Sequence, residues 1–177
     1  AAGVTVGVNT TFDCSDLGNR TYTLTVSDVA VPANTMTCTG TVKIIDNIAP
    51  VVNCPTNITV AAGAGCQTAA SAIPKLAMAL IPANQTISGP GEYKDNCGAP
   101  AIAYALINPD GSQQNGTYPI PSSKQFQKGA TIITYTFTDA DGNNTVCSFT
   151  VNVVDQTAPV WSGTGQAPNS TITLNAN

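Results

Sequence analysis

Oxygen-bearing side chains alternate along residues 139–143, where the sequence reads Asp-Ala-Asp-Gly-Asn. Asp139, Asp141 and Asn143 could offer carboxylate and amide oxygens, which are the ligands that Ca²⁺ takes in proteins. Asp46 and Asp155 each lie three residues before an Ala-Pro step, and either could complete such a site where one structural unit meets the next. Ca²⁺ is therefore the cofactor to consider, with Asp139, Asp141, Asn143 and Asp155 as its candidate ligands.

Cysteines are the second group with chemistry to offer. The chain has six cysteines and no histidine, and no two cysteines form a C-x-x-C pair. Zinc and redox motifs therefore fit poorly, whereas cysteines scattered along strands are typical of disulfides in an oxidising, extracytoplasmic compartment. We expect all six to form disulfides: Cys14, Cys38, Cys54, Cys66, Cys97 and Cys147.

Other chemistry is poorly supported. Glu92 and Asp95 are the one close Glu/Asp pair, but the chain has no histidine base and no G-x-S-x-G motif, so we expect no enzyme. Lys and Arg total six and the net charge is −4, which argues against nucleic-acid binding. No apolar run reaches the ~18 residues of a membrane span, so we expect none in this segment.

The elements that carry these residues are short Thr- and Val-rich runs broken by Gly, Pro and Asn, a pattern typical of an all-β sandwich. Strands are predicted at residues 101–107 and 125–128, and a hairpin is predicted around residues 139–143. Residues 74–93 contain three prolines and predict a long loop with a short helical turn at residues 75–80. Asp110-Gly111 and Asn115-Gly116 are turn signals.

An altered copy of the final hairpin occurs early in the chain. Cys38 and Cys147 are 109 positions apart, as are Asp46 and Asp155. We therefore predict tandem repeats: residues 1–47 are the C-terminal half of one, 48–157 are a complete repeat, and 158–177 supply the first strand of a third.

The early copy also bears on the Ca²⁺ hypothesis. It reads VAVPANTM where the later copy has its acidic turn, and it keeps no carboxylate there besides Asp28. An obligatory Ca²⁺ site in every repeat is thereby excluded. We favour a plain hairpin turn, in which Gly142 and Asn143 adopt positive φ.

Several segments resemble the HYR (hyalin repeat) family of immunoglobulin-like modules, namely APVVNCPTNITV, GAGC, DNCG and FQKGATIITYTFTDADGNNTVCSFTVNVVD. The segment FDCSDLGNRTYTLTVSD resembles repeats in large surface adhesins of gliding Bacteroidota, of the SprB type. The insertion between Pro74 and Tyr93 departs from the usual short connection of the family. The resemblance implies an immunoglobulin-like sandwich in a secreted or cell-surface adhesion array, and it does not imply catalysis.

In an immunoglobulin-like order, the first and last strands begin at the same pole, so we pair Cys54 with Cys147. Cys66 and Cys97 would then pair with each other, although the strand order alone places them near opposite poles. Cys14 and Cys38 pair with each other or with cysteines upstream of this segment.

We therefore expect an extracellular stalk, whose partners are neighbouring repeats and which holds a binding region away from the cell. One alternative is a module that binds a glycan or protein, with Tyr93 and Trp161 as aromatic contacts. Another is a filament subunit that exchanges strands. The chain also has seven N-x-[ST] sequons, which we expect to carry no glycans, at Asn9, Asn19, Asn57, Asn84, Asn115, Asn143 and Asn169.

Overall fold

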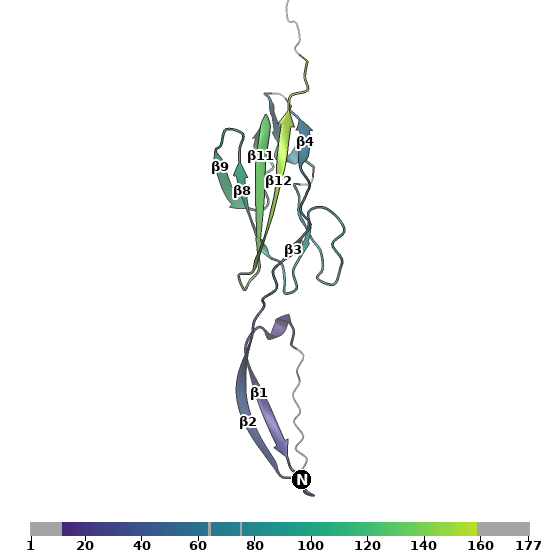
Figure 1. Ribbon diagram of the computed structural model, residues 1–177, viewed down its shortest axis with the longest axis vertical. Helices are drawn as coiled ribbons and strands as arrows, with labels where there is room; N and C mark the ends of the chain where they lie inside the picture. Colours follow the sequence, from purple (N-terminus) through teal and green to yellow (C-terminus); the bar gives the residue numbers. More distant parts are fainter. Residues whose placement is uncertain (1–11, 64, 75, 159–177) are drawn as a thin grey trace, which may run out of the picture.

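The structure, a computed structural model, describes residues 12–63, 65–74 and 76–158 (Figure 1). These residues are all-β apart from two single-turn 3-10 helices, η1 (Cys14–Asp16) and η2 (Ala70–Ala72). The strands build an immunoglobulin-like sandwich, as the sequence predicts. The described residues end at residue 158. Trp161 and nearly all of the predicted third repeat, residues 158–177, therefore lie outside them. No helix in the described part of the chain is long and apolar enough to cross a membrane.

A separate hairpin precedes the sandwich, and the two are stacked end to end along the long axis (Figure 1). It consists of β1 (Gly18–Ser27) and β2 (Thr35–Ile44), which pair antiparallel with Leu24 opposite Cys38. No residue of either strand is fully buried, although Leu24 and Val42 are half-buried. The hairpin therefore has a strand-like alternation but only a small core of its own.

The larger sheet of the sandwich has five strands in the order β4-β12-β11-β8-β9. β11 and β12 form its central hairpin, and β4 pairs parallel with the end of β12. Alternate side chains of both central strands are buried, as period-two patterning requires. The strands are β4 (Ile58–Ala61), β8 (Ala101–Ile107), β9 (Gln113–Thr117), β11 (Gly129–Thr138) and β12 (Asn144–Val154).

Shorter strands form the opposing layer. A three-stranded sheet has the order β3-β7-β6, and β5 pairs with β10. Tyr93 of β7 packs on Phe137 of β11, with ring centroids 5.1 Å apart, and Phe126 of β10 is fully buried. Burying a large apolar side chain of this kind contributes about 1.5–3 kcal/mol. The strands are β3 (Val51–Val52), β5 (Gln67–Ala69), β6 (Ala79–Leu80), β7 (Glu92–Lys94) and β10 (Gln125–Gln127).

The insertion at residues 74–93 differs from its prediction. No helix forms among the described residues at 75–80, where Leu76 and Met78 are instead buried against the sandwich. The Tyr118 hydroxyl accepts from the Met78 N–H at 2.9 Å and lies 3.2 Å from the Met78 carbonyl, to which it donates. The Tyr135 hydroxyl donates to the Leu76 carbonyl at 3.3 Å. Tertiary contacts thus fix this proline-rich segment in an extended form.

The second predicted turn, Asn115-Gly116, is also wrong, because both residues lie within β9. Gly116 is opposite Tyr104 of β8, and a Cβ atom at residue 116 would meet the tyrosine ring at 2.5 Å. The glycine therefore makes room for an aromatic ring on the neighbouring strand.

The two ends of the sandwich differ in what they hold. We call the end facing the hairpin the near pole, where the loop at residues 95–98 and the turn at residues 139–143 meet the incoming chain (Figure 1). The opposite end is the far pole. There Lys128 donates its N–H to the Cys66 carbonyl at 3.0 Å, and its Nζ lies 3.9 Å from Asp155.

Candidate functional site at the junction

The junction is the region where residues 45–50 connect the hairpin to the near pole. Asp46 closes a local turn by accepting the Ile48 N–H at 3.0 Å. Pro50 is fully buried, and its carbonyl accepts from the Thr145 hydroxyl at 2.5 Å. Because proline fixes φ and lacks an N–H, this anchored residue restricts how the linker can bend.

A disulfide crosses the junction. It joins Cys14 of η1 to Cys97 of the loop at residues 95–98, with the two Cα atoms 5.2 Å apart. η1 is held in shape by a reciprocal cap, in which the Ser15 N–H donates to Asp13 at 2.8 Å and the Asp13 N–H donates to Asp16 at 3.1 Å. The hairpin segment and the sandwich are therefore covalently linked through side chains as well as through the linker.

This bridge corrects two of the expected pairings. Cys66 and Cys97 are not joined, because Cys66 lies at the far pole and Cys97 at the near pole. Cys14 does not pair with Cys38, which lies within β2 opposite Leu24. Cys38 and Cys66 are free and exposed, so the expectation that all six cysteines form disulfides is wrong.

The other bridge has the predicted partners. Cys54, before β4, is joined to Cys147 of β12, with Cα atoms 5.5 Å apart. Cys147 is 1% exposed and belongs to the core. The first and last strands of the sandwich are thus linked within its interior near the pole that faces the hairpin.

The turn at residues 139–143 is organised around one carboxylate. Asp139 accepts from the backbone N–H groups of Asp141 at 2.9 Å and Asn143 at 2.8 Å, and from Asn143 Nδ2 at 2.7 Å. Burial, the largest single influence, acts to raise the Asp139 pKa, but these hydrogen bonds together lower the pKa below its ordinary value. Gly142 has φ +92°, as predicted, whereas Asn143 is not among the described residues with positive φ.

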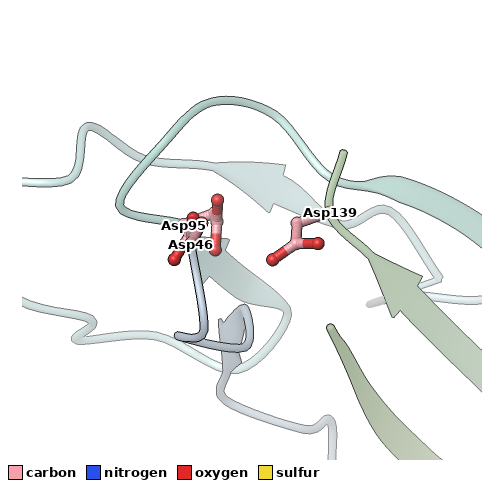
Figure 2. Close-up of side chains that lie close together, drawn as sticks. All are labelled: Asp46, Asp95 and Asp139. Carbon is pink, nitrogen blue, oxygen red and sulfur yellow. The ribbon is translucent and has the colours of Figure 1, made fainter. Parts of the chain in front are cut away.

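Three carboxylates meet beside this turn. Asp46, Asp95 and Asp139 each place a carboxylate oxygen so that the three oxygens lie within 4.8 Å of one another. Figure 2 shows Asp46 and Asp95 side by side, with Asp139 facing them. They come from the linker after β2, the loop after β7 and the turn after β11. We call these three residues the acidic cluster.

Asp95 is the most enclosed member of the acidic cluster. The residue is 6% exposed, and its Oδ2 accepts from the Cys97 N–H at 3.1 Å. Its Oδ1 is buried and has no hydrogen-bond partner. A buried carboxylate oxygen without a donor is costly, so this atom lacks an interaction that most buried polar atoms have.

Neutral donors contact the acidic cluster, and none of its members forms an ion pair with another described residue. The ion pairs in the described part of the chain join Arg20 to Asp16 and Lys128 to Asp155, and neither involves the cluster. Asn96 Nδ2 lies 3.1 and 3.0 Å from the two carboxylate oxygens of Asp46. Amide dipoles therefore offset the like-charge repulsion only in part.

The predicted Ca²⁺ ligands are thus distributed over three places. Asp139 belongs to the acidic cluster, and Asn143 borders it as a hydrogen-bond donor. Asp141 is exposed and outside the cluster, and Asp155 lies at the far pole near Lys128. Sequence reasoning considered Asp46 for this role but placed Asp95 only in a carboxylate pair with Glu92.

Glu92 does not join Asp95 in the cluster. Its carboxylate accepts the backbone N–H groups of Gly89 at 2.8 Å and Ser88 at 2.7 Å, and it closes the loop before β7. The short sequence spacing between Glu92 and Asp95 therefore does not create a catalytic pair. The sequence feature that could have pointed to Asp95 as a cluster member is the DNCG motif, in which it lies two residues before Cys97, whose disulfide crosses the junction.

The hairpin repeats the geometry of the turn. Asp28 accepts from the backbone N–H groups of Ala30 at 3.0 Å and Asn34 at 2.8 Å, and from Asn34 Nδ2 at 2.7 Å. The Asn34 side chain is the main cause of an Asp28 pKa below its ordinary value. The early copy therefore retains the Asp–Asn pair of the turn, in a loop two residues longer, and has no carboxylate equivalent to the exposed Asp141. Although Asp141 has no counterpart in the early copy, Asp28 still provides the carboxylate that corresponds to Asp139 of the acidic cluster.

The aromatic residues suggested for ligand binding are placed differently. Tyr93 is 8% exposed and packs in the core, so it is not a surface contact. Trp161 lies outside the described residues. Beside the insertion there is a hollow of about 410 Å³, lined by Leu80, Ile81, Pro82, Ala83, Asp95, Asn96, Gly98 and Ala99.

The family model of the HYR domain matches residues 110–153. The matched span runs from the turn before β9 to the end region of β12, and it includes the turn that carries Asp139. Over these residues the chain is similar to HYR domains. No curated protein sequence matches the chain significantly. The HYR match and the two disulfides indicate an extracellular repeat module.

Proposed function

We propose that the chain is a spacer segment of a large cell-surface adhesin, in which tandem immunoglobulin-like repeats hold a distal binding region away from the cell. The observation that carries this proposal is the Cys14–Cys97 bridge across the junction. A bridge between successive units is useful where their relative orientation must be kept. The buried Pro50 adds a second restraint in the linker itself.

The surface and dimensions fit a spacer role. Only 9% of residues are charged, so the surface has few groups for non-specific electrostatic contacts. The 11 residues of β12 span about 36 Å, so each complete repeat would add roughly that length to a stalk. Neighbouring repeats of the same chain are its immediate partners, and none of the site geometry calls for an enzymatic role.

The parent is, in this proposal, a surface adhesin of the kind found on gliding Bacteroidota. The support is the resemblance of the segment FDCSDLGNRTYTLTVSD to repeats of such proteins. In the structure this segment supplies η1, with its bridging cysteine, and all of β1. The part of the sequence that suggests this setting is therefore also the part that fastens the junction.

Small-angle X-ray scattering of the intact chain in calcium-free buffer tests the spacer proposal. The wild type should scatter as one elongated particle, whereas Cys14→Ser combined with Cys97→Ser should show a broader distribution of lengths. Cys38→Ser is the matched control, because Cys38 is free and exposed on the hairpin. A wild type that scatters as two loosely connected bodies, or a double variant as rigid as the wild type, would refute the proposal.

A ligand-binding role is the second candidate, and the hollow beside the insertion favours it. Its lining is mainly aliphatic and includes the polar residues Asp95 and Asn96, which suits a sugar or a peptide. Glycan-array binding by the intact chain that is lost in Ala99→Trp, which would fill the hollow, would support this role. Concentration-dependent growth in light scattering would instead favour the strand-exchanging filament.

A further inference from the structure

We propose that the acidic cluster of Asp46, Asp95 and Asp139 binds one Ca²⁺ ion, which fastens the hairpin to the sandwich. The inference deepens the proposed spacer function. It rests on that function only for the role of the ion, which is to hold two units of the stalk together. The binding itself follows from the three carboxylates, from the atom that lacks a partner and from the kind of donor present.

The unpartnered oxygen of Asp95 is the first reason. Three carboxylate oxygens lie within 4.8 Å of one another, a separation that a shared cation can bridge. Asp95 contributes one of these oxygens, and its Oδ1 is enclosed by the protein and has no hydrogen-bond partner. Water and backbone N–H groups usually satisfy such an atom, and neither a described N–H nor a described side chain does so here. A cation coordinated at this oxygen would supply the missing interaction.

The surrounding asparagines are the second reason. Asn96 and Asn143 turn their Nδ2 groups toward the carboxylates of Asp46 and Asp139. Each of these side chains also has a carbonyl oxygen, which rotation of the amide would present in place of the donor. The Asp46 backbone carbonyl lies beside the cluster as well, since it accepts from Asn143. The site thus offers further neutral oxygens to an ion.

The donor set selects the ion. Every candidate ligand is an oxygen, the chain has no histidine, and the nearby Cys97 is bound in a disulfide. Oxygen-only sets favour Ca²⁺ or Mg²⁺ over zinc or copper. Ca²⁺ accepts six to eight ligands in irregular geometry, whereas Mg²⁺ requires a near-ideal octahedron. Ligands drawn from a linker, a loop and a turn fit the less demanding ion.

Two of the three carboxylates recur by position along the chain. Asp155 corresponds to Asp46 at the exit of the complete repeat, and Asp28 corresponds to Asp139 in the turn of the hairpin. Each repeat therefore has the means to contribute an exit carboxylate to the junction that follows it and a turn carboxylate to the junction that precedes it. One ion at the junction between the hairpin and the sandwich is the expected stoichiometry.

Isothermal titration of the intact, chelator-treated chain with CaCl₂ tests the site. We expect one ion per chain with Kd on the order of 10⁻⁴ M, as in extracellular modules. Asp95→Asn should weaken binding by at least about tenfold, because the enclosed ligand oxygen becomes an amide. Asp141→Asn is the control, since it removes the same charge at an exposed residue outside the cluster, in the turn that carries Asp139. MgCl₂ should bind at least about tenfold more weakly.

Thermal unfolding provides a second readout. CaCl₂ at a hundred times Kd should raise the Tm of the wild type by roughly 5–10 °C, and this shift should vanish in Asp95→Asn. Asp46→Asn repeats the test at a residue outside the sandwich, in case the loop variant fails to fold. Absence of binding by the wild type would overturn the proposal, as would equal losses in Asp141→Asn and Asp95→Asn. A rigid particle in scattering without Ca²⁺ binding would sink this inference and leave the spacer function standing.

Discussion

Asn143 lies 97 positions after Asp46 in the sequence, yet its Nδ2 donates to the Asp46 carbonyl oxygen at 3.1 Å. The same amide donates to Asp139 at 2.7 Å. One side chain therefore holds the linker and the turn together at the junction. Its counterpart Asn34 makes the equivalent bond to Asp28 in the hairpin.

Replacing Asn143 by alanine should lower the free energy of unfolding by about 1–2 kcal/mol, because a partly buried donor to two acceptors is lost. Urea denaturation measures the change. Asn144→Ala removes the neighbouring exposed amide at the start of β12 and should cost little. Equal losses in the two variants would show that the bonds of Asn143 are not special.

Removing the core disulfide should destabilise the sandwich strongly. Replacing Cys54 and Cys147 together by alanine opens a loop with a sequence separation of 93. The chain-entropy relation then predicts a loss of roughly 4–5 kcal/mol. Cys66→Ala, at a free and exposed cysteine, is the control for denaturation under oxidising conditions. A double variant whose free energy of unfolding lies within about 1 kcal/mol of the wild-type value, the size of an ordinary point-mutation effect, would contradict this account.

Glu92 should contribute to acid sensitivity. The Gly89 N–H, followed by the Ser88 N–H, lowers its pKa below the ordinary value of 4.5. Because the folded state has the lower pKa, the stabilisation is present above the ordinary value and is lost as the pH falls through the folded value. Urea midpoints of the wild type and Glu92→Gln should therefore differ near neutral pH and converge in acid. A difference that is independent of pH would count against this assignment.

Tyr118→Phe should loosen the insertion. The Met78 N–H would lose its acceptor at a buried position, which costs about 1–3 kcal/mol. Hydrogen exchange should accelerate at residues 76–81 while β11 and β12 stay protected. Tyr22→Phe, at a half-exposed tyrosine of the hairpin, is the matched control. Unchanged exchange in the insertion would mean that burial of Leu76 and Met78 suffices to hold it.

Strand periodicity made much of the sandwich predictable. The strand predicted at residues 101–107 coincides with β8, and the pairing of Cys54 with Cys147 followed from strand order. Both depend on local alternation and on the pole at which a strand begins. Local alternation can be read directly from the sequence, whereas the strand order is what the resemblance to immunoglobulin-like modules implies.

Loop contacts were not predictable in the same way. Asp46 and Asp95 meet because a linker and a loop are brought to one pole, and no periodicity relates them. The bridge from Cys14 to Cys97 crosses from η1 to the sandwich, so the parity of strand residues could not reveal it. The insertion misled for another reason: its short apolar run resembles a helical turn, but two tyrosine hydroxyls and core burial fix it as extended chain.

The bridge between Cys54 and Cys147 also determines how tension would pass through the sandwich. A pull applied at the linker and at the far-pole exit reaches Cys54 within a few residues and crosses directly to Cys147. The 93-residue separation between them is bypassed by a covalent bond, so the segment they enclose carries none of the load. Even a forcibly unfolded repeat could lengthen only by its short flanking stretches. Between these two points the sandwich would behave under load as a nearly inextensible tether.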